Sequence, residues 1–327
     1  MPDAIALGEL LVDFVSVVPD APLSVLPRFV GAAGGAPANV AVGLARHGVS
    51  SGFVGTVGDD PFGEFLRRTL DVEGVDVSHL NRHGAARTTL AFIATRGDGR
   101  KDISFYRHPG ADMMLLPQDI DSVYLRTARL FHFGSVSLSM PPAREATQHA
   151  ARVAREAGLL ISYDPNWRPT LWSDQAEARQ LIWEAMPLAD IVHCAEEEWE
   201  YVTGTADLVA GAARVLSEGV KLVVVTQGER GCYYDTGAAR GQVNGYAVEV
   251  VDPTGAGDAF VAALLAQLLR SPIPAPEMGE NHLREIMGYA NAAGALTCTR
   301  AGAIPSLPRA GEVEAFLSRP PGPCRET

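Results

Sequence analysis

The sequence predicts an α/β protein with a doubly wound, mostly parallel central sheet, helices on both of its faces, and a small additional β-sheet. Strand-like apolar runs alternate with helical patterns along most of the chain. Two regions, 11–30 and 88–107, look like strands without intervening helices. A glycine-rich turn at 252–258 leads into a strongly apolar helix. Such sheets bind ligands beyond the carboxyl ends of their strands, so residues that follow strands are the first candidates for a site.

The alternation is regular enough to assign individual elements. The expected strands are 128–136, 159–163, 189–194, 221–226 and 248–251, and the expected helices are 38–46, 141–157, 174–186, 206–218, 259–269 and 283–297. The N-terminal run 1–10 lacks a basic start and carries Glu9, so we interpret it as a first strand and not as a signal peptide.

The two helix-free regions are expected to form a small antiparallel sheet. Gly97-Asp98-Gly99 is a turn signal between two of its strands. One interpretation is a lid built from about 11–33 and 88–107, and the other is an ordinary extension of the main sheet edge. Either way we expect residues 1–327 to form a single domain.

Composition excludes several classes of protein. The net charge is -12, and of 27 basic residues only Lys101 and Lys221 are lysine, which leaves 25 arginines. Neither lysine lies in a phosphate-binding G-x-x-x-x-G-K-[ST] loop, and no basic run indicates a nucleic-acid partner. No apolar stretch approaches the roughly 20 residues of a membrane span. The four cysteines show no paired spacing, which favours reduced thiols in a cytoplasmic protein.

The turn at 252–258 predicts an anion site. It reads Asp-Pro-Thr-Gly-Ala-Gly-Asp and ends at the start of the apolar helix. A glycine-rich helix start presents unpaired N–H groups and the positive end of the helix dipole, so it can hold a phosphate without lysine. Asp258 lies where that anion would bind. From the residues alone it is either a helix cap or a base that accepts a proton from an attacking hydroxyl.

Three ordered motifs resemble those of the ribokinase-like (PfkB) family of carbohydrate kinases. The string 252–260 is similar to the C-terminal signature of that family, and 34–41, Gly-Gly-Ala-Pro-Ala-Asn-Val-Ala, is similar to its N-terminal signature. Thr226-Gln227-Gly228 to Gly231 resembles its nucleotide-binding Thr-x-Gly-x-x-Gly motif. The matching segments run from about residue 5 to 308, and they imply a ribokinase-like fold with a β lid.

The resemblance also implies roles for individual residues. Asp258 would be the catalytic base, and the amides of Gly255, Ala256 and Gly257 would form the anion hole for the transferred phosphoryl group. The residues expected near the sugar are Asp13, Gly34, Gly35 and Asn39, together with Arg107 and Arg168, which could instead lie near the phosphates. Asn39 could also be an ordinary polar residue on a helix face, and Arg168 could form a structural ion pair with Asp164.

Nucleotide and cation sites follow from the same resemblance. Thr226, Gly228 and Gly231 are expected near the ATP phosphates, and Asn291 near the adenine. Mg²⁺ is expected with ATP, with Glu198 acting through metal-bound water, since Ala195 replaces the asparagine that is frequent in the family. Glu198 could also simply favour a helix start. The residues expected to bind K⁺ are Asp252, Thr254, Gly302 and Ser306.

Within the family, the strings 105–113 and 163–172 resemble fructokinases, which implies ATP-dependent phosphorylation of fructose. Kinases of 2-keto-3-deoxygluconate share part of the second string and are the alternative. A non-catalytic sugar sensor would be expected to lack Asp258 or the glycine turn, and a dinucleotide-dependent dehydrogenase would need G-x-G-x-x-G after the first strand. The expected partners are a small-molecule sugar and ATP, with no nucleic acid and no membrane. A homodimer through an exposed face of the small sheet is left open.

Overall fold

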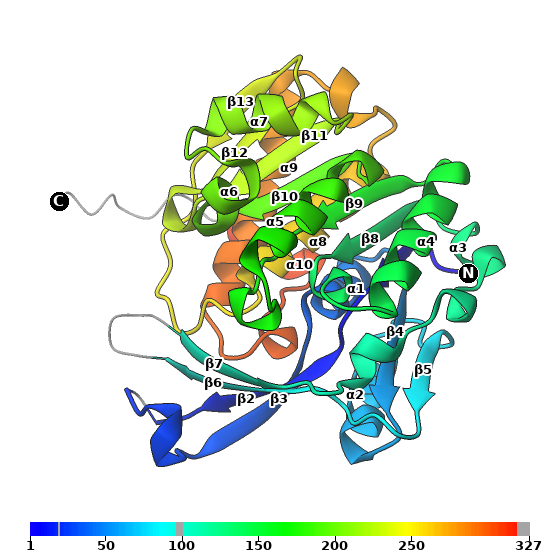
Figure 1. The fold of residues 1–327 in the computed structure, drawn as a ribbon. Helices are drawn as coiled ribbons and strands as arrows, with labels where there is room; N and C mark the ends of the chain where they lie inside the picture. The colour runs from blue at the N-terminus through cyan, green and yellow to red at the C-terminus, as the bar shows by residue number, and fades with distance from the viewer. Residues whose placement is uncertain (19, 96–100, 319–327) are drawn as a thin grey trace.

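The computed structural model describes residues 1–18, 20–95 and 101–318, which build a large sheet and a small one (Figure 1). The order of strands in the large sheet is β13-β12-β11-β10-β9-β8-β1-β4-β5. The strands are β1 (Ala4–Leu7), β4 (Ser51–Gly58), β5 (Leu80–His83), β8 (Leu130–Gly134), β9 (Leu160–Asp164), β10 (Ile191–Ala195), β11 (Leu222–Thr226), β12 (Cys232–Asp235) and β13 (Arg240–Val243). All pairs from β5 to β11 are parallel, and β12 and β13 are antiparallel.

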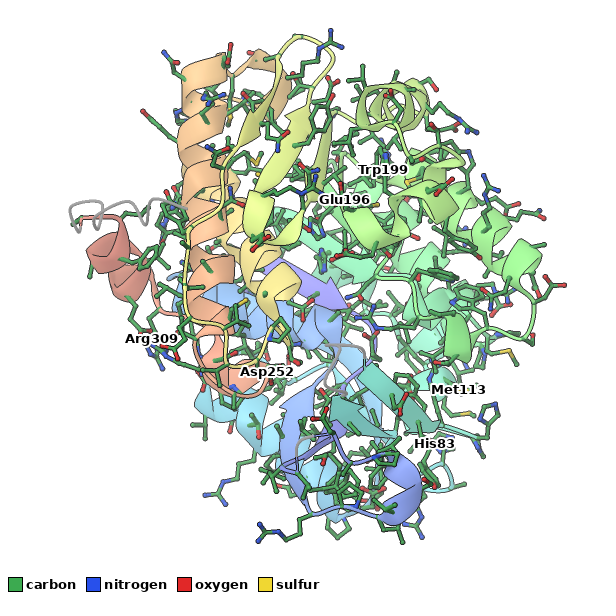
Figure 2. The ribbon with its side chains drawn as sticks, turned by 90° about the vertical axis from the view of Figure 1, so that its left-hand side faces the viewer. His83, Met113, Glu196, Trp199, Asp252 and Arg309 are labelled. Atoms are coloured by element: carbon green, nitrogen blue, oxygen red, sulfur yellow. The ribbon has the colours of Figure 1, made fainter. Side chains whose placement is uncertain are left out.

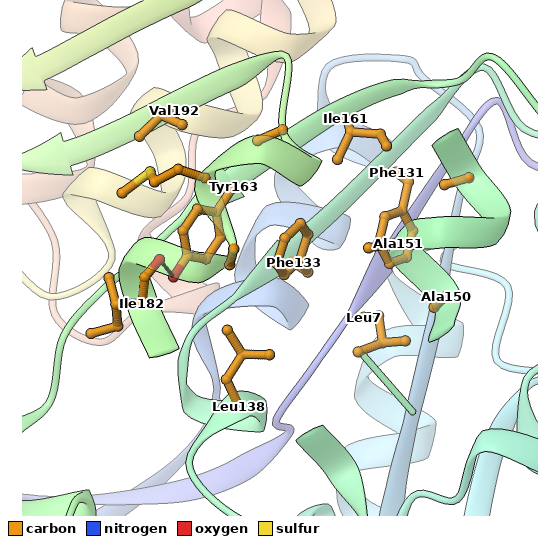
Figure 3. Packing of buried hydrophobic residues seen from close by; sticks show 14 of the residues in the cluster. Leu7, Phe131, Phe133, Leu138, Ala150, Ala151, Ile161, Tyr163, Ile182 and Val192 are labelled. Carbon is orange, nitrogen blue, oxygen red and sulfur yellow. Dashed lines mark hydrogen bonds between the residues drawn. The ribbon is translucent and has the colours of Figure 1, made fainter. Parts of the chain in front are cut away.

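Helices cover both faces of this sheet, which confirms the predicted fold class. They are α1 (Ala36–Arg46), α2 (Pro61–Val72), α3 (Ser122–Leu125), α4 (Ala143–Glu156), α5 (Gln175–Glu184), α6 (Glu196–Thr203), α7 (Leu208–Ser217), α8 (Ala256–Arg270), α9 (Glu280–Cys298) and α10 (Ala310–Leu317). Helices α4 to α7 share one core with Phe131, Phe133 and Tyr163 on one face of the sheet. Figure 3 shows Ala150 and Ala151 of α4 and Ile182 of α5 in this core. Helices α1, α8 and α9 pack on the other face.

Strand residues alternate between the two faces, and this alternation determines which side chains meet α8. In β10, Val192 and Cys194 belong to the core under α4 to α7, whereas Ile191 belongs to the core under α8 and α9. Because successive side chains of a strand point to opposite faces, His193 points toward α8. Its ring stacks on Phe260 of that helix, with 5.6 Å between the ring centroids.

The small sheet is mixed, so the prediction of an antiparallel sheet is wrong. Its order is β3-β2-β6-β7, with β2 (Leu11–Ser16), β3 (Phe29–Gly34), β6 (Leu90–Thr95) and β7 (Lys101–Tyr106). The central pair, β2 and β6, is parallel, and the two outer pairs are antiparallel. Strands β2 and β6 each follow a strand of the parallel main sheet, β1 and β5, and therefore leave it in the same direction. The predicted turn at 97–99 lies outside the described residues.

Strand 248–251 was also predicted wrongly. The segment forms no strand, and the side chains of Val250 and Val251 are exposed. The backbone amides of Val251 and Asp252 donate to the carbonyl oxygen of Cys298 at the end of α9, at 2.8 and 3.1 Å. The segment thus runs beside a helix end and has no sheet edge to join, which an apolar sequence run cannot reveal.

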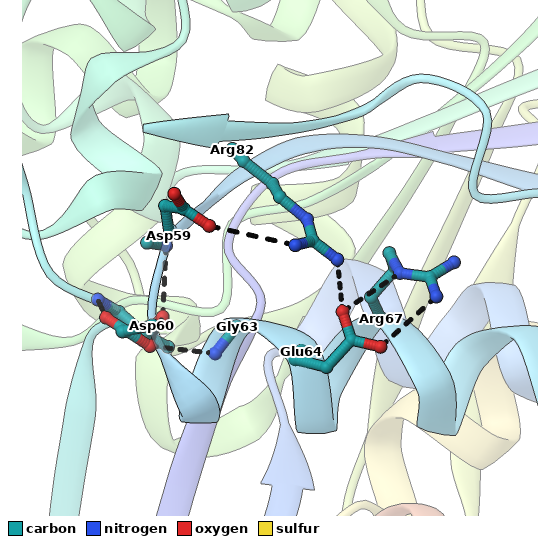
Figure 4. A network of polar contacts seen from close by, with 8 residues as sticks. Asp59, Asp60, Gly63, Glu64, Arg67 and Arg82 are labelled. Atoms are coloured by element: carbon teal, nitrogen blue, oxygen red, sulfur yellow. Dashed lines mark hydrogen bonds and ion pairs between the residues drawn. The ribbon is translucent and has the colours of Figure 1, made fainter. Parts of the chain in front are cut away.

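A polar network near α2 holds the chain where it enters the small sheet (Figure 4). Asp60 caps α2 by accepting a hydrogen bond from the amide of Gly63 at 2.9 Å. The same carboxylate accepts from the amide and the hydroxyl of Thr88, at 2.9 and 2.8 Å. Because Thr88 lies just before β6, this cap also positions the small sheet against the main one.

Among the helices within the described ranges, none has both the length and the apolar character needed to cross a bilayer.

We expect Gly43→Ala to destabilise the protein, because α1 and α8 approach closely at this glycine. A Cβ at Gly43 would lie 2.5 Å from the Cβ of Ala262. The helices would have to separate, at a typical cost of about 1–3 kcal/mol. Thermal unfolding measures the change as a lowered Tm. The matched control is Gly311→Ala in α10, where no atom lies within 4 Å of the added Cβ. An equal Tm for the two variants would show that the α1–α8 contact is not tight.

Candidate active site

The site lies where α8 begins, at the carboxyl edge of the parallel strands. Gly255 precedes the helix with φ +84°, a left-handed conformation that favours glycine, and a Cβ there would lie 3.2 Å from the Cα of Ala303. Ala256 and Gly257 form the first turn of α8, so the helix begins three residues before the predicted 259 and includes part of the predicted glycine-rich turn. The amide of Ala256 donates to the carbonyl oxygen of Pro253 at 3.2 Å, so an anion would compete with this turn bond. The anion hole stays a prediction.

Asp258, in the first turn of α8, is buried and hydrogen bonded to α1. The Nδ2 of Asn39 donates to its Oδ2 at 2.7 Å. Burial raises the pKa of Asp258 to about 6, while the Asn39 bond opposes that rise. A carboxylate with a pKa near the working pH can accept a proton and release it again, as a general base must. Asn39 is itself buried, so it is not a solvent-facing residue of α1, and its contact with the sugar stays a prediction.

Beside Asp258, three neighbouring strands contribute a buried polar chain. His193 of β10 contacts Asp164 of β9 through Nδ1, at 3.0 Å from Oδ2. Its Nε2 lies 3.1 Å from the hydroxyl of Thr226 at the end of β11. A Cβ at Gly257 would lie 3.9 Å from the Cε1 of His193, so the imidazole borders the glycine turn.

The predicted sugar residues at the start of the chain meet where the small sheet joins the large one. Asp13 of β2 pairs with Ala32 of β3, and its carboxylate reaches Gly34, where a Cβ would lie 2.0 Å from its Oδ2. Gly35, with φ +110°, passes so close to Glu9 that a Cβ would lie 2.3 Å from the Glu9 carbonyl oxygen. The Glu9 carboxyl accepts from the amide of Ala36 at 3.0 Å, and burial raises its pKa to about 7. Both glycines are thus required for the close approach.

The two arginines predicted near the sugar or phosphates have different environments. Arg107 is buried and its Nε donates to Asp112 at 2.7 Å, while its other nitrogens donate to Ser139 and Val136 at 3.0 and 3.3 Å. This arginine therefore anchors the end of β7, and a contact with ligand stays a prediction. Arg168 is exposed and donates to the carbonyl oxygen of Trp167 at 3.2 Å. Its direct ion pair with Asp164 does not form among the described residues, since Asp164 pairs with His193.

Of the predicted nucleotide residues, Thr226 ends β11, Gly228 and Gly231 follow it, and Asn291 lies in α9. Gly228 is exposed in the turn, and Gly231 packs so tightly that a Cβ would lie 2.0 Å from the carbonyl oxygen of Val243. Asn291 is buried, and its amide donates to the carbonyl oxygens of Val243 and Asn244 at 3.1 and 3.2 Å. It therefore fixes the segment after β13, and its approach to adenine remains a prediction.

Glu198, the predicted magnesium residue, is held by the backbone. Its two oxygens accept from the amides of Ala195 and Trp167, at 3.0 and 2.6 Å. Burial, with a smaller contribution from the charge of Asp164, raises its pKa to about 7. Because both oxygens are already engaged, Glu198 fits a role through metal-bound water better than direct coordination. No cluster of three or more His, Cys, Asp or Glu suited to a metal occurs within the described ranges.

Three of the four predicted potassium residues form one cluster. Asp252 accepts from the amide and hydroxyl of Thr254, at 3.0 and 2.6 Å, and from the amide of Gly302 at 3.0 Å. Asp252 lies beside the end of α9 (Figure 2). Ser306 is buried nearby along the chain and donates to the carbonyl oxygen of Ala303 at 2.8 Å. Carboxylate, hydroxyl and carbonyl oxygens are the donors that hard cations prefer, so the chemistry of this set suits a hard cation, and K⁺ binding stays a prediction.

A parallel α/β sheet that places a buried carboxyl beside a glycine-rich helix start is the arrangement expected of a phosphotransferase acting on a hydroxyl group. Comparison with known proteins gives the family. Residues 1–310 match the pfkB family of carbohydrate kinases. The chain belongs to this family, and the resemblance stated from its motifs is confirmed.

Similar proteins cover nearly the whole chain. "Probable fructokinase-4" of Arabidopsis thaliana is 43% identical over 314 residues, which are 96% of each chain. The structure of fructokinase from Xylella fastidiosa with bound ATP is 33% identical, with a TM-score of 0.88, over 97% of this chain and 98% of that one. A double mutant of Vibrio cholerae O395 fructokinase, bound to fructose, ADP and a potassium ion, is 34% identical with a TM-score of 0.88, over 97% and 99%.

Two polar groups of the site were not recognised from the sequence. His193 was not singled out, and Asp164 was considered only as a partner for Arg168. A signal was present, because His193 interrupts the apolar run Ile191-Val192-His193-Cys194 of a buried strand. A polar residue in such a strand needs a partner, but the strand order that supplies Asp164 and Thr226 is a tertiary property.

We expect Gly34→Ala to weaken sugar binding selectively, because the new Cβ would occupy the place of the Asp13 carboxylate. Displacing this group should raise KM for the sugar on the order of tenfold or more, with little change in KM for ATP. Steady-state kinetics with each substrate varied in turn measures both constants. The matched control is Gly84→Ala, where no atom lies within 4 Å of the added Cβ. Equal increases in both KM values would argue against a local effect on Asp13.

Proposed function

We propose that this protein is an ATP-dependent fructokinase that converts D-fructose and ATP to D-fructose 6-phosphate and ADP. The observation that carries the proposal is Asp258, a buried carboxyl with a raised pKa, in the first turn of α8 and beside the glycine turn. The fructokinase-like strings 105–113 and 163–172 support fructose as the sugar. Further support comes from the similarity over nearly the full chain to proteins named fructokinases.

In this proposal Asp258 accepts the proton of the attacking sugar hydroxyl, and Asn39 holds the carboxylate in place. The hydroxyl oxygen then attacks the γ-phosphorus while ADP leaves. Backbone amides of the turn 255–257 stabilise the charge on the transferred group. Mg²⁺, when bound with ATP, neutralises part of the phosphate charge. Glu198 would face its hydration shell, and the oxygen cluster around Asp252 and Thr254 would hold K⁺ beside the turn.

We further propose that the chain works as one domain, with the small sheet as a lid over the sugar. Asp13 and Gly34 lie on β2 and β3 of the small sheet, whereas Asp258 lies in α8, which packs on the large sheet. Bringing them together in one site requires the small sheet to cover the carboxyl edge of the large sheet. A homodimer and a cytoplasmic location stay predictions from the sequence.

A 2-keto-3-deoxygluconate kinase is the second candidate. The exposed guanidinium of Arg168, just beyond β9, favours it, because an acidic sugar would be attracted to an arginine at this edge.

A sugar panel tests the proposed substrate. Fructose, 2-keto-3-deoxygluconate, ribose and adenosine are each assayed with ATP and Mg²⁺, with and without K⁺ at constant ionic strength. We expect the highest kcat/KM for fructose and faster turnover with K⁺. Efficient turnover of ketodeoxygluconate without turnover of fructose would exclude the fructokinase assignment. Equal rates with and without K⁺ would contradict the expected activation by K⁺.

We expect Asp258→Asn to lower kcat by about 10²–10⁴-fold, because general-base help of this size would be lost. In the unmodified enzyme the base must be deprotonated, so kcat/KM should fall as pH decreases through about 6, the raised pKa of Asp258. The residual activity of the variant should lack this acid limb. The control is Asp59→Asn, a carboxylate on the surface network of Figure 4. Near-normal kcat in Asp258→Asn would refute the base assignment.

A further inference from the structure

The proposed reaction assigns no role to Asp164 and His193, which are connected by hydrogen bonds to Thr226. Asp164 and His193 are 4% and 3% exposed, whereas Thr226 is only partly buried. The three side chains come from the adjacent strands β9, β10 and β11 and point toward α8. A buried carboxyl–imidazole pair therefore ends in a hydroxyl at the accessible edge of the sheet, next to the glycine turn.

Hydrogen-bond capacity fixes most proton positions in this chain. Asp164 accepts from the amide of Asn166 through Oδ1 at 3.0 Å, and its Oδ2 faces the Nδ1 of His193. An ionised carboxylate only accepts, so Nδ1 carries a proton. Hydrogen-bond capacity does not determine whether Nε2 also carries a proton. If His193 is an imidazolium, Nε2 donates to the Thr226 oxygen and the hydroxyl proton is free. If His193 is neutral, the Thr226 hydroxyl must donate to Nε2 and presents only lone pairs outward.

The charges around His193 favour the imidazolium. Burial alone would lower its pKa, but the nearby carboxylate of Asp164, its hydrogen bond and the charges of Glu198 and Asp258 together raise the pKa above the ordinary value. The other histidine of this region, His132 of β8, is bonded to Ser162, and burial lowers its pKa to about 4, so it is neutral. The positive charge of Arg168, at the surface, acts to lower the pKa values of Asp164, Glu198 and Asp258.

We propose that His193 is a positioning residue for the nucleotide: held by Asp164, its imidazolium donates a hydrogen bond from Nε2 to the Thr226 oxygen, so the Thr226 hydroxyl can donate its own hydrogen bond to a phosphate oxygen. This inference rests on the proposed function. It also gives the site a fixed buried cation. Lys221 cannot supply one, since it pairs with Asp190 at 2.9 Å just before β11, at the opposite edge of the sheet.

The test uses His193→Gln, which imitates the neutral state. Its amide N–H₂ can donate to Asp164 and its carbonyl can accept from the Thr226 hydroxyl, so that hydroxyl stays turned inward. The dissociation constant of ADP with Mg²⁺ is measured by calorimetry from pH 6.5 to 9 for the unmodified enzyme, His193→Gln, Thr226→Val and the double variant. The nucleotide's own titration is the same for all four proteins.

We expect His193→Gln to bind ADP on the order of tenfold more weakly near pH 7. The unmodified enzyme should approach the affinity of this variant as His193 loses its proton at alkaline pH. Thr226→Val should also lose the pH dependence, and adding His193→Gln to it should change nothing further. Fructose affinity should stay the same in every variant.

Three outcomes would overturn the proposal. One is an unchanged affinity and pH profile in His193→Gln, and another is additivity of the two substitutions. The third is pH dependence that survives in Thr226→Val, which would mean that His193 acts by charge alone. If His193→Gln does not fold, the profile of Thr226→Val still decides between the last outcome and the proposal. Failure of the proposed function would differ, because the unmodified enzyme would then bind no nucleotide or phosphorylate no sugar.

Discussion

The hydrogen bond between Asn39 and Asp258 is the interaction on which the site depends. It joins residues 219 positions apart, at 2.7 Å and away from water. Each partner needs the other, since an unpaired buried carboxylate would be costly. The bond forms only because Gly43 and Ala262 let α1 and α8 pack closely, and because Gly35 lets the chain turn into α1 beside Glu9.

The electrostatic potential in this site depends on where individual charged groups and donors lie and not on the net charge of the chain. The chain carries -12 overall, yet the carboxyls at the edge of the sheet are each held by a particular donor. Asp258 faces an amide, Glu198 faces two backbone N–H groups, and Asp164 faces an imidazole. Buried acids with such partners create local fields that differ from the field of the whole molecule. An acidic, lysine-poor protein can therefore provide an anion site.

The small sheet shows which structural features can be predicted from sequence patterns and which cannot. Two regions without helical periodicity, 11–30 and 88–107, predicted roughly where its strands lie but not where each begins and ends, since β3 runs from Phe29 to Gly34. Its parallel central pair was missed, since the pairing of β2 with β6 depends on where β1 and β5 lie in the main sheet. The same limit applies to 248–251, which has strand-like residues but lies beside the end of α9.

The sequence by itself determined the fold class, the family and the glycine turn with Asp258, because these depend on local periodicity and on contiguous motifs. Only the tertiary structure decided the partners of the buried polar groups. In the tertiary structure, Asn39 is the hydrogen-bond partner of Asp258, and Asp112 is the partner of Arg107. His193 has two partners, Asp164 and Thr226. The physical reason is that a buried polar side chain must find a hydrogen-bond partner, and which partner is within reach depends on strand order and helix packing.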